Sequence, residues 1–538
     1  MTAIEARIHR SPFPAPVAPV SPVVALLRDA AADPESLAIV DGASGVAPSR
    51  RRVAEWSAAI AAGLAERGVE RGEPVALAMP NLPGWPVIAL GIWRAGAAVC
   101  ALSPFWGAEE TARLLALVSP RIAIASPEVA EVMRDAAAIA GLGTEVAVAE
   151  EAPGDAPVPD LAADDGDAPT APRLAPDDLA AIVFSSGTSG PFKGVRLTVR
   201  NLAASAAQVA TSFALDGGYD GDSVALAGAP FFASMGLGAA LCAPLSVGAP
   251  IVTVPVPQTE ALLAAAAAHR ATHAVVPLTV LEEVASAAAA PAHDLSSLRL
   301  LATGGAHVPP AVELVASERV GCPARDGYGM TEATSMISGP LGRPNDPDTV
   351  GWLAAGTQAR IVDQESGRDV EAGTAGEVWI RGPQVMEGYH GDVQATAATL
   401  TADGWLRTGD LGRMLEDGQL VLVDRLKELI KVRGAQVAPA EVELVLREHP
   451  AVRDAAVVGR PDPARGEVPV AHVVPAGNAS PKELAEYVAS RLARHKRLHD
   501  VRIVESLPRA PSGKLLRYLI RDRERDAARR ASGAAQRT

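Results

Sequence analysis

Lysine is the scarcest charged residue of this 538-residue chain, in which six lysines stand beside 43 arginines. An ammonium group is a compact point charge, whereas a guanidinium group is a planar fork. A chain that uses arginine for general positive charge therefore keeps lysine for work that arginine cannot do. We treat the six lysines as candidate functional positions, with chance retention as the alternative for any one of them. They are Lys193, Lys427, Lys431, Lys482, Lys496 and Lys514.

Cysteine and long apolar runs are scarce as well. The three cysteines, Cys100, Cys242 and Cys322, are far apart and include no C-x-x-C pair. This excludes a disulfide framework and a cysteine zinc site, and it predicts buried thiols in a reducing, cytoplasmic setting. No segment approaches the roughly 18 uninterrupted apolar residues of a transmembrane helix. The formal net charge of -14 argues against a nucleic-acid partner.

Helix-like and strand-like segments alternate in the first part of the chain. Val53–Ala65 and Pro86–Gly96 have the spacing of helices. Pro74–Ala78, Ile122–Ala125 and Ala180–Phe184 are short apolar runs typical of buried strands. The alternation predicts an α/β fold whose parallel sheets are covered by helices.

The later part of the chain predicts two further units. Gln358–Val362 and Gly376–Ile380 have the pattern of strands in a β-rich subdomain, and an α/β pattern restarts with a helix at Pro439–Glu448. We expect a large N-terminal domain over 1–423, a hinge at 424–427 and a small, mobile α+β domain over 428–538. The charged end of the chain, from about residue 522, is expected to be disordered.

A loop of small residues follows the apolar run Ala180–Phe184 and reads Ser185-Ser186-Gly187-Thr188-Ser189-Gly190-Pro191-Phe192-Lys193. Small residues let backbone N–H groups approach phosphate oxygens, hydroxyl groups add donors, and the lysine adds positive charge. The loop is not a Walker A motif, because Gly194 follows the lysine. Taken alone, it predicts either a phosphate-binding loop or an ordinary turn.

Four further motifs distinguish between these alternatives. They are Gly327-Tyr328-Gly329-Met330-Thr331-Glu332, Thr408-Gly409-Asp410, Asp424-Arg425-Leu426-Lys427-Glu428-Leu429-Ile430-Lys431 and Pro511-Ser512-Gly513-Lys514. In this order, and after the small-residue loop, they resemble the core motifs of the adenylate-forming superfamily of acyl-CoA synthetases, adenylation domains and luciferases. The nearest resemblance is to 4-coumarate–CoA ligase-like acyl-CoA synthetases, because of the segment Val437-Ala438-Pro439-Ala440-Glu441.

The resemblance implies how a nucleotide is held. Asp410 would accept hydrogen bonds from the ribose hydroxyls with support from Arg425, and Tyr328 would stack on adenine. Glu332, with Thr188 or Thr331 near it, would bind Mg²⁺, a cation that prefers oxygen ligands. The alternatives are a solvated surface acid at Glu332 and a surface ion pair at Asp410. The residues expected to bind ATP are Ser185, Ser186, Gly187, Thr188, Ser189, Gly190, Lys193, Gly304, Gly305, Ala306, Asp326, Gly327, Tyr328, Gly329, Thr331, Asp410, Arg425 and Lys514.

The resemblance also implies two half-reactions. Lys514 would reach the carboxylate and the α-phosphate during adenylation. Rotation of the small domain about Lys427 would then bring Lys431, Arg433 and Gly434 to the coenzyme A site. Catalytic roles therefore fall to Lys514, Lys431, Glu332 and Thr188.

An acyl pocket is expected in the same part of the chain. Its predicted residues are Phe232, Ala233, Met235, Gly236, Gly305 and Met330. Coumarate-ligase relatives usually carry histidine where Ala233 stands, and amino-acid-activating domains carry aspartate there. Alanine leaves space for a bulky acid and cannot pair with a substrate ammonium, which argues against an α-amino acid.

These features predict an AMP-forming acyl- or aryl-CoA synthetase that uses ATP, Mg²⁺ and coenzyme A. Its substrate would be a hydrophobic carboxylic acid of secondary metabolism or catabolism, and a homodimer is compatible with the resemblance. One alternative is an acyl-AMP ligase that loads a carrier protein. Another is a non-catalytic nucleotide-binding regulator, against which the joint presence of Lys193, Glu332, Asp410 and Lys514 argues.

Overall fold

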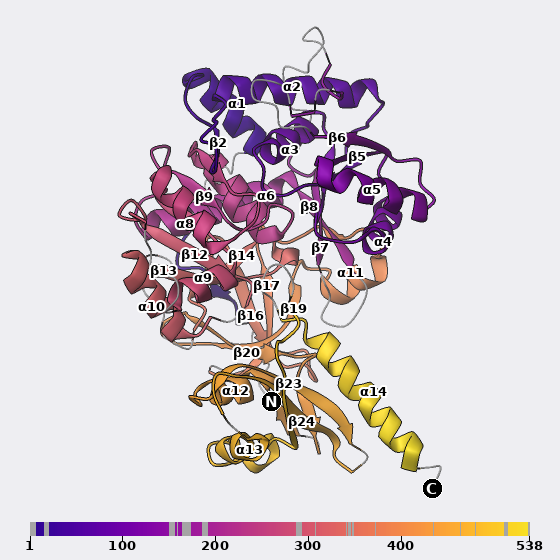
Figure 1. The fold of residues 1–538 in the computed structure, drawn as a ribbon, viewed down its shortest axis with the longest axis vertical. Helices are drawn as coiled ribbons and strands as arrows, with labels where there is room; N and C mark the ends of the chain where they lie inside the picture. Colours follow the sequence, from indigo (N-terminus) through magenta and orange to yellow (C-terminus); the bar gives the residue numbers. More distant parts are fainter. Residues whose placement is uncertain are drawn as a thin grey trace.

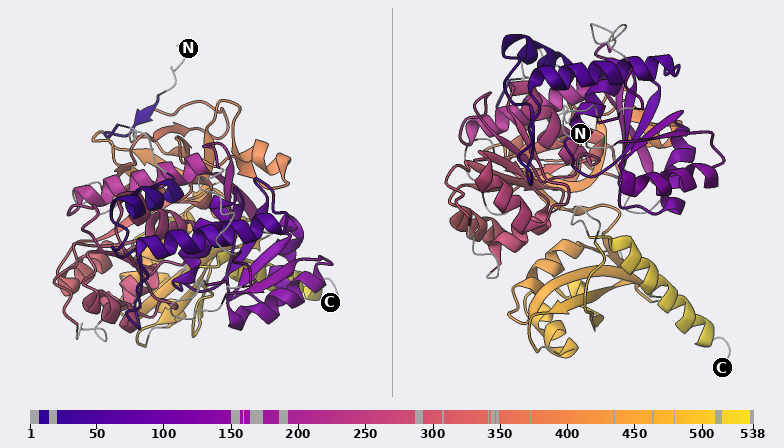
Figure 2. Two further views of the ribbon diagram at one scale, coloured as in Figure 1. Left: turned by 90° about the horizontal axis from the view of Figure 1, so that it is seen from above. Right: turned by 45° about the horizontal axis from the view of Figure 1, so that its top comes forward.

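The computed structural model describes residues 7–14, 21–149, 157–158, 160–163, 174–185, 192–286, 293–306, 308–340, 342, 346, 349–371, 373–433, 435–462, 464–478, 480–509 and 515–535. Two bodies are visible, a large one and a smaller C-terminal one drawn in orange and yellow (Figures 1 and 2). None of the helices in the described ranges combines the length and apolar character needed to cross a membrane.

The first sheet of the large body has seven strands. Their order is β18 (Gly388–Tyr389), β8 (Lys193–Thr198), β7 (Leu179–Ser185), β4 (Ala98–Leu102), β3 (Pro74–Ala78), β5 (Ile122–Ala125) and β6 (Glu145–Val148). The five strands from β7 to β6 are parallel, whereas β8 and β18 are added antiparallel. The predicted strands at 74–78 and 122–125 are confirmed with these bounds.

Helices cover both faces of this sheet because its strands are apolar on both sides. Val75 and Leu77 of β3 pack in the core with α2 (Arg50–Glu66) and α3 (Gly84–Arg94). Ala76 and Ala78 point to the other face, where α4 (Ala108–Val118) and α5 (Pro127–Ile139) pack. The helices predicted at 53–65 and 86–96 are confirmed as α2 and α3, with the second beginning two residues earlier.

The second sheet has eight strands, of which the central ones are also parallel. Their order is β15 (Trp352–Leu353), β14 (Met336–Gly339), β13 (Ala324–Gly329), β12 (Leu300–Gly304), β11 (His273–Val275), β9 (Ala225–Ala227), β10 (Ile251–Thr253) and β2 (Ile39–Asp41). The helices of this region are α1 (Pro22–Ala32), α7 (Ala243–Val247), α8 (Thr259–Ala268), α9 (Leu278–Ala285) and α10 (Pro310–Val320).

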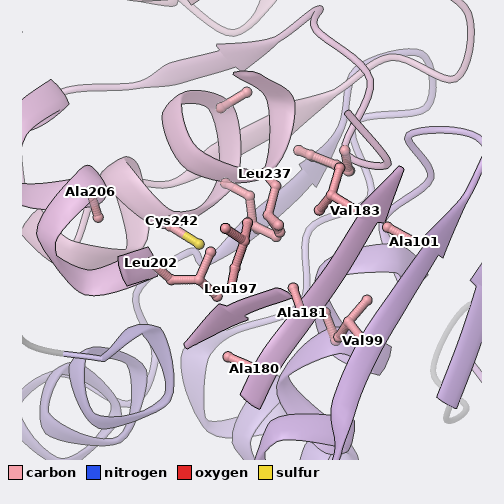
Figure 3. Close-up of a cluster of buried hydrophobic side chains, with 14 of the residues drawn as sticks. Val99, Ala101, Ala180, Ala181, Val183, Leu197, Leu202, Ala206, Leu237 and Cys242 are labelled. Carbon is pink, nitrogen blue, oxygen red and sulfur yellow. The ribbon is translucent and has the colours of Figure 1, made fainter. Parts of the chain in front are cut away.

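One helix, α6 (Val199–Leu215), connects the two sheets in the core. Thr198 and Asn201 form a capping box at its start, and the Asn201 Nδ2 group donates to the carbonyl oxygens of Pro383 and Val385 at 2.8 Å. Its apolar residues pack with the π-helix η1 (Gly236–Cys242) and with β4, β7 and β8 (Figure 3). Cys242 lies in this cluster, and the prediction of buried thiols is confirmed for all three cysteines.

A third, antiparallel sheet completes the large body. Its order is β1 (His9–Arg10), β16 (Gln358–Val362), β17 (Gly376–Arg381), β19 (Leu406–Met414) and β20 (Leu420–Arg425). The short helices η2 (Thr331–Ala333) and α11 (Val393–Thr399) lie between its strands in the sequence. The predicted β-rich subdomain is this sheet.

The small C-terminal body has its own mixed sheet and helices. The strands are β21 (Ile430–Val432), β22 (Ala435–Val437), β23 (Val452–Asp462), β24 (Gly466–Pro475) and β25 (Asp500–Ile503). The helices are α12 (Pro439–Arg447), α13 (Pro481–Ala489), η3 (Arg494–Lys496) and α14 (Arg517–Ala535). The expectation of a disordered tail from about residue 522 is wrong for the described residues. They continue α14, in which Glu524 is buried and accepts a hydrogen bond from His472 at 3.0 Å.

Candidate active site

A cavity of about 660 Å³ opens where the carboxyl ends of β12 and β13 face β8, β19 and β20. The carboxyl ends of parallel strands are the usual place for a ligand in such sheets, because loops there can diverge. Most predicted site residues outside the small domain reach this cavity. Those that line it are Ser185, Lys193, Ala233, Met235, Gly304, Gly305, Asp326, Gly327, Tyr328, Gly329, Met330, Thr331, Glu332, Arg425 and Lys427.

Asp410 forms a buried polar triad with two of these residues. The Tyr328 hydroxyl donates to its Oδ2 at 2.5 Å, and the Arg425 Nε group pairs with its Oδ1 at 3.0 Å. Asp410 and Arg425 are direct neighbours across β19 and β20, so the sheet register itself brings the charges together. Because the Asp410 side chain is only 6% exposed, the alternative of a surface ion pair is excluded.

The local electrostatics keep this triad in one protonation state. Burial and the adjacent Asp410 carboxylate raise the pKa of Tyr328 well above its usual value, so its hydroxyl stays a donor. The same carboxylate raises the pKa of Arg425. A fixed carboxylate held by two donors is suited to accept further hydrogen bonds from a vicinal diol.

Glu332 occupies a second buried position, at the start of η2. Its carboxylate oxygen Oε1 accepts hydrogen bonds from the Ser185 hydroxyl at 3.1 Å and from the Tyr389 hydroxyl at 2.9 Å. The Lys193 ammonium lies 4.6 Å from the centre of the Tyr389 ring. Because Glu332 is 8% exposed, it is not the solvated surface acid of the alternative interpretation. The predicted phosphate-loop residues Ser186, Gly187, Thr188, Ser189 and Gly190 lie outside the described residues.

Glu332 fits the chemistry of a magnesium ligand. Both hydrogen bonds use Oε1, and Oε2 is the oxygen that neither donor uses. Mg²⁺ is commonly held by one or two carboxylates together with substrate phosphates and water. Within the described ranges, no cluster of three or more acidic, histidine or cysteine side chains could form a metal cage from protein groups alone. The single buried carboxylate of Glu332, close to Lys193, matches the arrangement in which one carboxylate holds Mg²⁺ together with substrate phosphates and water.

Of the residues predicted to bind ATP, Gly304, Gly305 and Tyr328 line the cavity, whereas Ala306 does not. Ala306 packs instead against the apolar core beneath the second sheet. The Asp326 backbone N–H donates to Glu313 of α10 at 2.6 Å. Burial and the Glu313 carboxyl raise the pKa of the Asp326 side chain well above its usual range.

Two residues predicted for the acyl pocket do not line the apolar end of the cavity. Ala233, Met235 and Met330 line it, but the ring of Phe232 points to Phe105 and Trp106, with centroids 6.3 and 6.5 Å away. Gly236 is buried within η1 and does not line the cavity. Its role is close packing, because a Cβ atom there would lie 1.8 Å from the Pro230 carbonyl oxygen.

Several residues that line the cavity belong to none of the predicted motifs. Val209, Ser212, Phe213 and Asp216 present one face of α6 to the cavity. Their spacing is that of one helix face, which a search for helical periodicity could have found. Tyr389, by contrast, belongs to a two-residue strand far along the chain, and no local pattern around it indicates a site.

Comparison with known proteins places this arrangement in a family. The AMP-binding enzyme family matches residues 26–390, and the AMP-binding enzyme C-terminal domain matches residues 441–514. The chain belongs to the AMP-binding enzyme family. The predicted superfamily and its α/β fold are thereby confirmed, and the chain is a ligase-family enzyme.

This AMP-binding enzyme is similar to proteins of several activities. It is 37% identical to 4-coumarate–CoA ligase 5 of Oryza sativa subsp. japonica, over 90% of both chains. ATP-bound MatB from Rhodopseudomonas palustris superposes with a TM-score of 0.85 at 26% identity, covering 95% of this chain and 100% of MatB. The amide bond synthetase McbA from Marinactinospora thermotolerans gives 0.82 at 30% identity, covering 93% and 99%.

The predicted coenzyme A residues of this AMP-binding enzyme lie on the small body. Lys431 and Arg433 are exposed at β21 and do not line the cavity. Lys427, the predicted hinge, is exposed at the mouth of the cavity and lines it. Gly434 and Lys514 lie outside the described residues.

Proposed function

We propose that this AMP-binding enzyme is an acyl-CoA ligase. It would join a carboxylic acid to AMP with release of pyrophosphate, and then transfer the acyl group to the thiol of coenzyme A. The observation that carries the proposal is one cavity that has both a polar end, lined by Tyr328 and Arg425, the partners of Asp410, and an apolar end around Ala233. The two ends adjoin where the Ser234 and Thr331 hydroxyl oxygens lie 3.4 Å apart. The similarity to named CoA ligases supports the same activity.

In the first step a carboxylate oxygen would attack the α-phosphorus of ATP, and the bond to pyrophosphate would break. Asp410 would hold the ribose diol, Tyr328 would lie against the base, and Lys193 would face the phosphate chain together with Ser185. Glu332 would hold Mg²⁺, which neutralises phosphate charge when it is bound. The protein contributes mainly by positioning these groups and by balancing charge, as in other phosphoryl-transfer sites.

The second step requires the small domain to change position. We place the domain boundary at 424–427, between a large domain over 1–423 and a small domain over 428–538. Two adjacent residues of β20 have partners in different bodies, which supports this position of the boundary. Arg425 pairs with Asp410 in the large body, whereas the Asp424 Oδ2 atom accepts the Ala440 backbone N–H of α12 at 2.9 Å. Rotation about Lys427 would withdraw Lys514 and present Lys431, Arg433 and Gly434 to coenzyme A.

The acid would be largely hydrophobic, with room for a bulky group beside Ala233. Val209, Phe213, Leu300 and Met336 supply apolar walls around it. Burial of apolar surface gives about 25 cal/mol per Å², so a matching acyl group gains affinity along these walls.

ATP–pyrophosphate exchange with a panel of carboxylic acids tests the first step. Thioester formation from the best acid, ATP and free coenzyme A tests the second. We expect exchange that depends on the acid, followed by thioester. Exchange without thioester, together with acyl transfer to a phosphopantetheine carrier, would replace the proposal by the carrier-loading alternative. Nucleotide binding without exchange for any acid would instead indicate a regulator.

A further inference from the structure

The cavity wall carries a further positively charged side chain, which the proposed function does not use. Arg325 stands at the start of β13 and lines the cavity. In the sheet register it is the neighbour of Ala302, which is the neighbour of Val275. All three line the cavity, so they form one transverse row on its floor.

The alternation of side chains along β13 indicates where this row lies relative to the reaction centre. Side chains alternate between the two faces of a strand, so Arg325 shares a face with Gly327, up to the register shift between Tyr328 and Gly329. The Asp326 side chain interacts with Glu313 of α10, whereas Tyr328, near the carboxyl end of the strand, donates its hydroxyl to Asp410. Gly327 adds no side chain to this face, and at Gly329 the Ser335 carbonyl oxygen takes the place of a side chain, because a Cβ atom there would lie 1.6 Å from it. The four residue steps from Gly329 back to Arg325 cover roughly 13 Å of strand. The guanidinium therefore closes the floor at the end away from the nucleotide.

Arg325 has unused hydrogen-bonding capacity. Among the described residues its Nε atom is buried without a hydrogen-bond partner, and its Nη1 atom donates to the Ala324 carbonyl oxygen at 3.2 Å. A guanidinium carries five N–H donors, and leaving buried donors unpaired is unfavourable. Phe213, Leu300 and Met336, which also line the cavity, offer no oxygen or nitrogen acceptor from their side chains.

The acidic side chains near Arg325 among the described residues form no ion pair with it. Asp216, at the end of α6, also lines the cavity, and its Oδ2 atom accepts a hydrogen bond from the Gly342 backbone N–H at 3.4 Å. Burial raises the pKa of Asp216, while the positive charge of Arg325 acts in the opposite direction. Glu313, on the far face of β13, is also influenced by Arg325, and its carboxylate is used by the Asp326 backbone.

We propose that the acid substrate carries a second hydrogen-bond acceptor at the end remote from its reacting carboxylate, and that Arg325 binds it. The acceptor is a carboxylate or a ketone oxygen. Both match a guanidinium donor, and a carboxylate could bind with two parallel hydrogen bonds. The inference rests on the proposed function, because it assigns a substrate class to the same cavity. The substrate is thus an acid with an apolar middle and a polar far end.

The test compares three series of acids in ATP–pyrophosphate exchange with the full-length enzyme. The series are unbranched monocarboxylic acids, their terminal methyl ketones and the corresponding dicarboxylic acids, each of about six to ten carbons to span the floor. At the best length, we expect at least one acceptor-bearing series to exceed the plain acids in kcat/KM by about 10- to 100-fold, the range for hydrogen bonds to a charged group. The stronger of the two series identifies the acceptor.

Arg325→Met should reverse this preference. Methionine fills similar space without donors, so the variant should lose the advantage of acceptor-bearing acids while keeping or improving exchange with the plain ones. Arg325→Lys should retain part of the preference. The matched control is Arg299→Met, because Arg299 is an exposed arginine near α6 that does not line the cavity. This control should leave the ranking of the acids unchanged.

Three outcomes would overturn the inference. Equal kcat/KM for plain and acceptor-bearing acids in the wild-type enzyme would do so, and so would an equal loss on all acids in Arg325→Met with an unchanged melting temperature. Both leave the proposed function standing, because exchange still occurs. Absence of exchange with every acid would overturn the proposed function and the inference with it.

Discussion

At the nucleotide end of the cavity, buried charged groups have partners within the protein, whereas at the acyl end Arg325 has a buried Nε without one among the described residues. Asp410 is held by Tyr328 and Arg425, and Glu332 is held by Ser185 and Tyr389. A ligand that is the same in every turnover can be met by groups that are already fixed in place. A site that selects one acid among many gains selectivity when its own polar group is satisfied only by the correct substrate.

The largest effect expected from this contrast concerns Lys514, which we propose to act at the nucleotide end in one half-reaction only. Loss of one well-placed charge donor typically costs about 2.7–4 kcal/mol, so Lys514→Ala should slow acyl-AMP formation by roughly 10²–10³-fold. With presynthesised acyl-AMP and coenzyme A, the same variant should form thioester at nearly the wild-type rate. Single-turnover measurement of each half-reaction checks both statements.

Two further lysine variants serve as controls for that experiment. Lys482→Ala should affect neither step, because Lys482 is on the surface of the small body with its side chain 84% exposed. Lys431→Ala should damage thioester formation more than Lys514→Ala does. If Lys514→Ala slowed both half-reactions equally without a change in melting temperature, alternation of the small domain would not apply to this enzyme.

The next prediction tests whether ATP and the acid bind at different ends of the cavity. Asp410→Asn keeps the shape of the side chain but removes the charge that Arg425 and Tyr328 face. Charge-assisted hydrogen bonds contribute about 1.5–3 kcal/mol, so kcat/KM for ATP should fall by about 10- to 100-fold. The ranking of acids in pyrophosphate exchange should stay the same. A changed acid ranking with a normal KM for ATP would mean that the nucleotide lies elsewhere.

Ala233→Leu should produce the opposite pattern. A larger side chain narrows the acyl end, and overpacking costs about 1–3 kcal/mol. The variant should therefore lose kcat/KM on bulky acids by about 5- to 100-fold, with smaller losses on short acids and no change in the KM for ATP. Measuring the acid panel at saturating ATP checks this, and an unchanged order of acids would contradict the assignment of Ala233 to the acyl pocket.

The smallest expected effect is on stability and concerns the junction between the bodies. Burial raises the pKa of Asp424 to about 6. The folded state therefore binds a proton more tightly than the unfolded state, so this group's contribution to stability is present at low pH and is lost as the pH rises through about 6. Asp424→Asn should gain on the order of 1 kcal/mol relative to wild type between pH 5 and pH 7.

Denaturant unfolding at those two pH values measures the difference between the enzymes. A second carboxylate, Glu443, offers a comparison, because Glu443→Gln removes its ion pair with Arg517 at 2.8 Å and should destabilise at both pH values. If the gap between wild type and Asp424→Asn did not vary with pH, the titration of Asp424 would not contribute to the stability of the junction.

The sequence predicted the strands and helices with strong local patterns. Pro74–Ala78 and Ile122–Ala125 were recovered with their bounds, because a continuous apolar run between turn residues is a local signal. The charged end of the chain was read as disordered because it has few apolar residues. Its helix α14 packs through Ile520 and a buried Glu524 that interacts with His472 and Arg502, residues that local composition does not connect with it.

The amino-acid sequence by itself determined the order of motifs, and with it the family and the presence of a C-terminal domain. Those features depend on residues close together in the chain, such as Thr408, Gly409 and Asp410. Only the tertiary structure decided that Tyr389 meets Glu332, that Phe232 turns away from the cavity and that Arg325 closes its floor. The physical reason is that strand alternation and sheet register select which side chains share a face, and register is set by packing across the whole sheet.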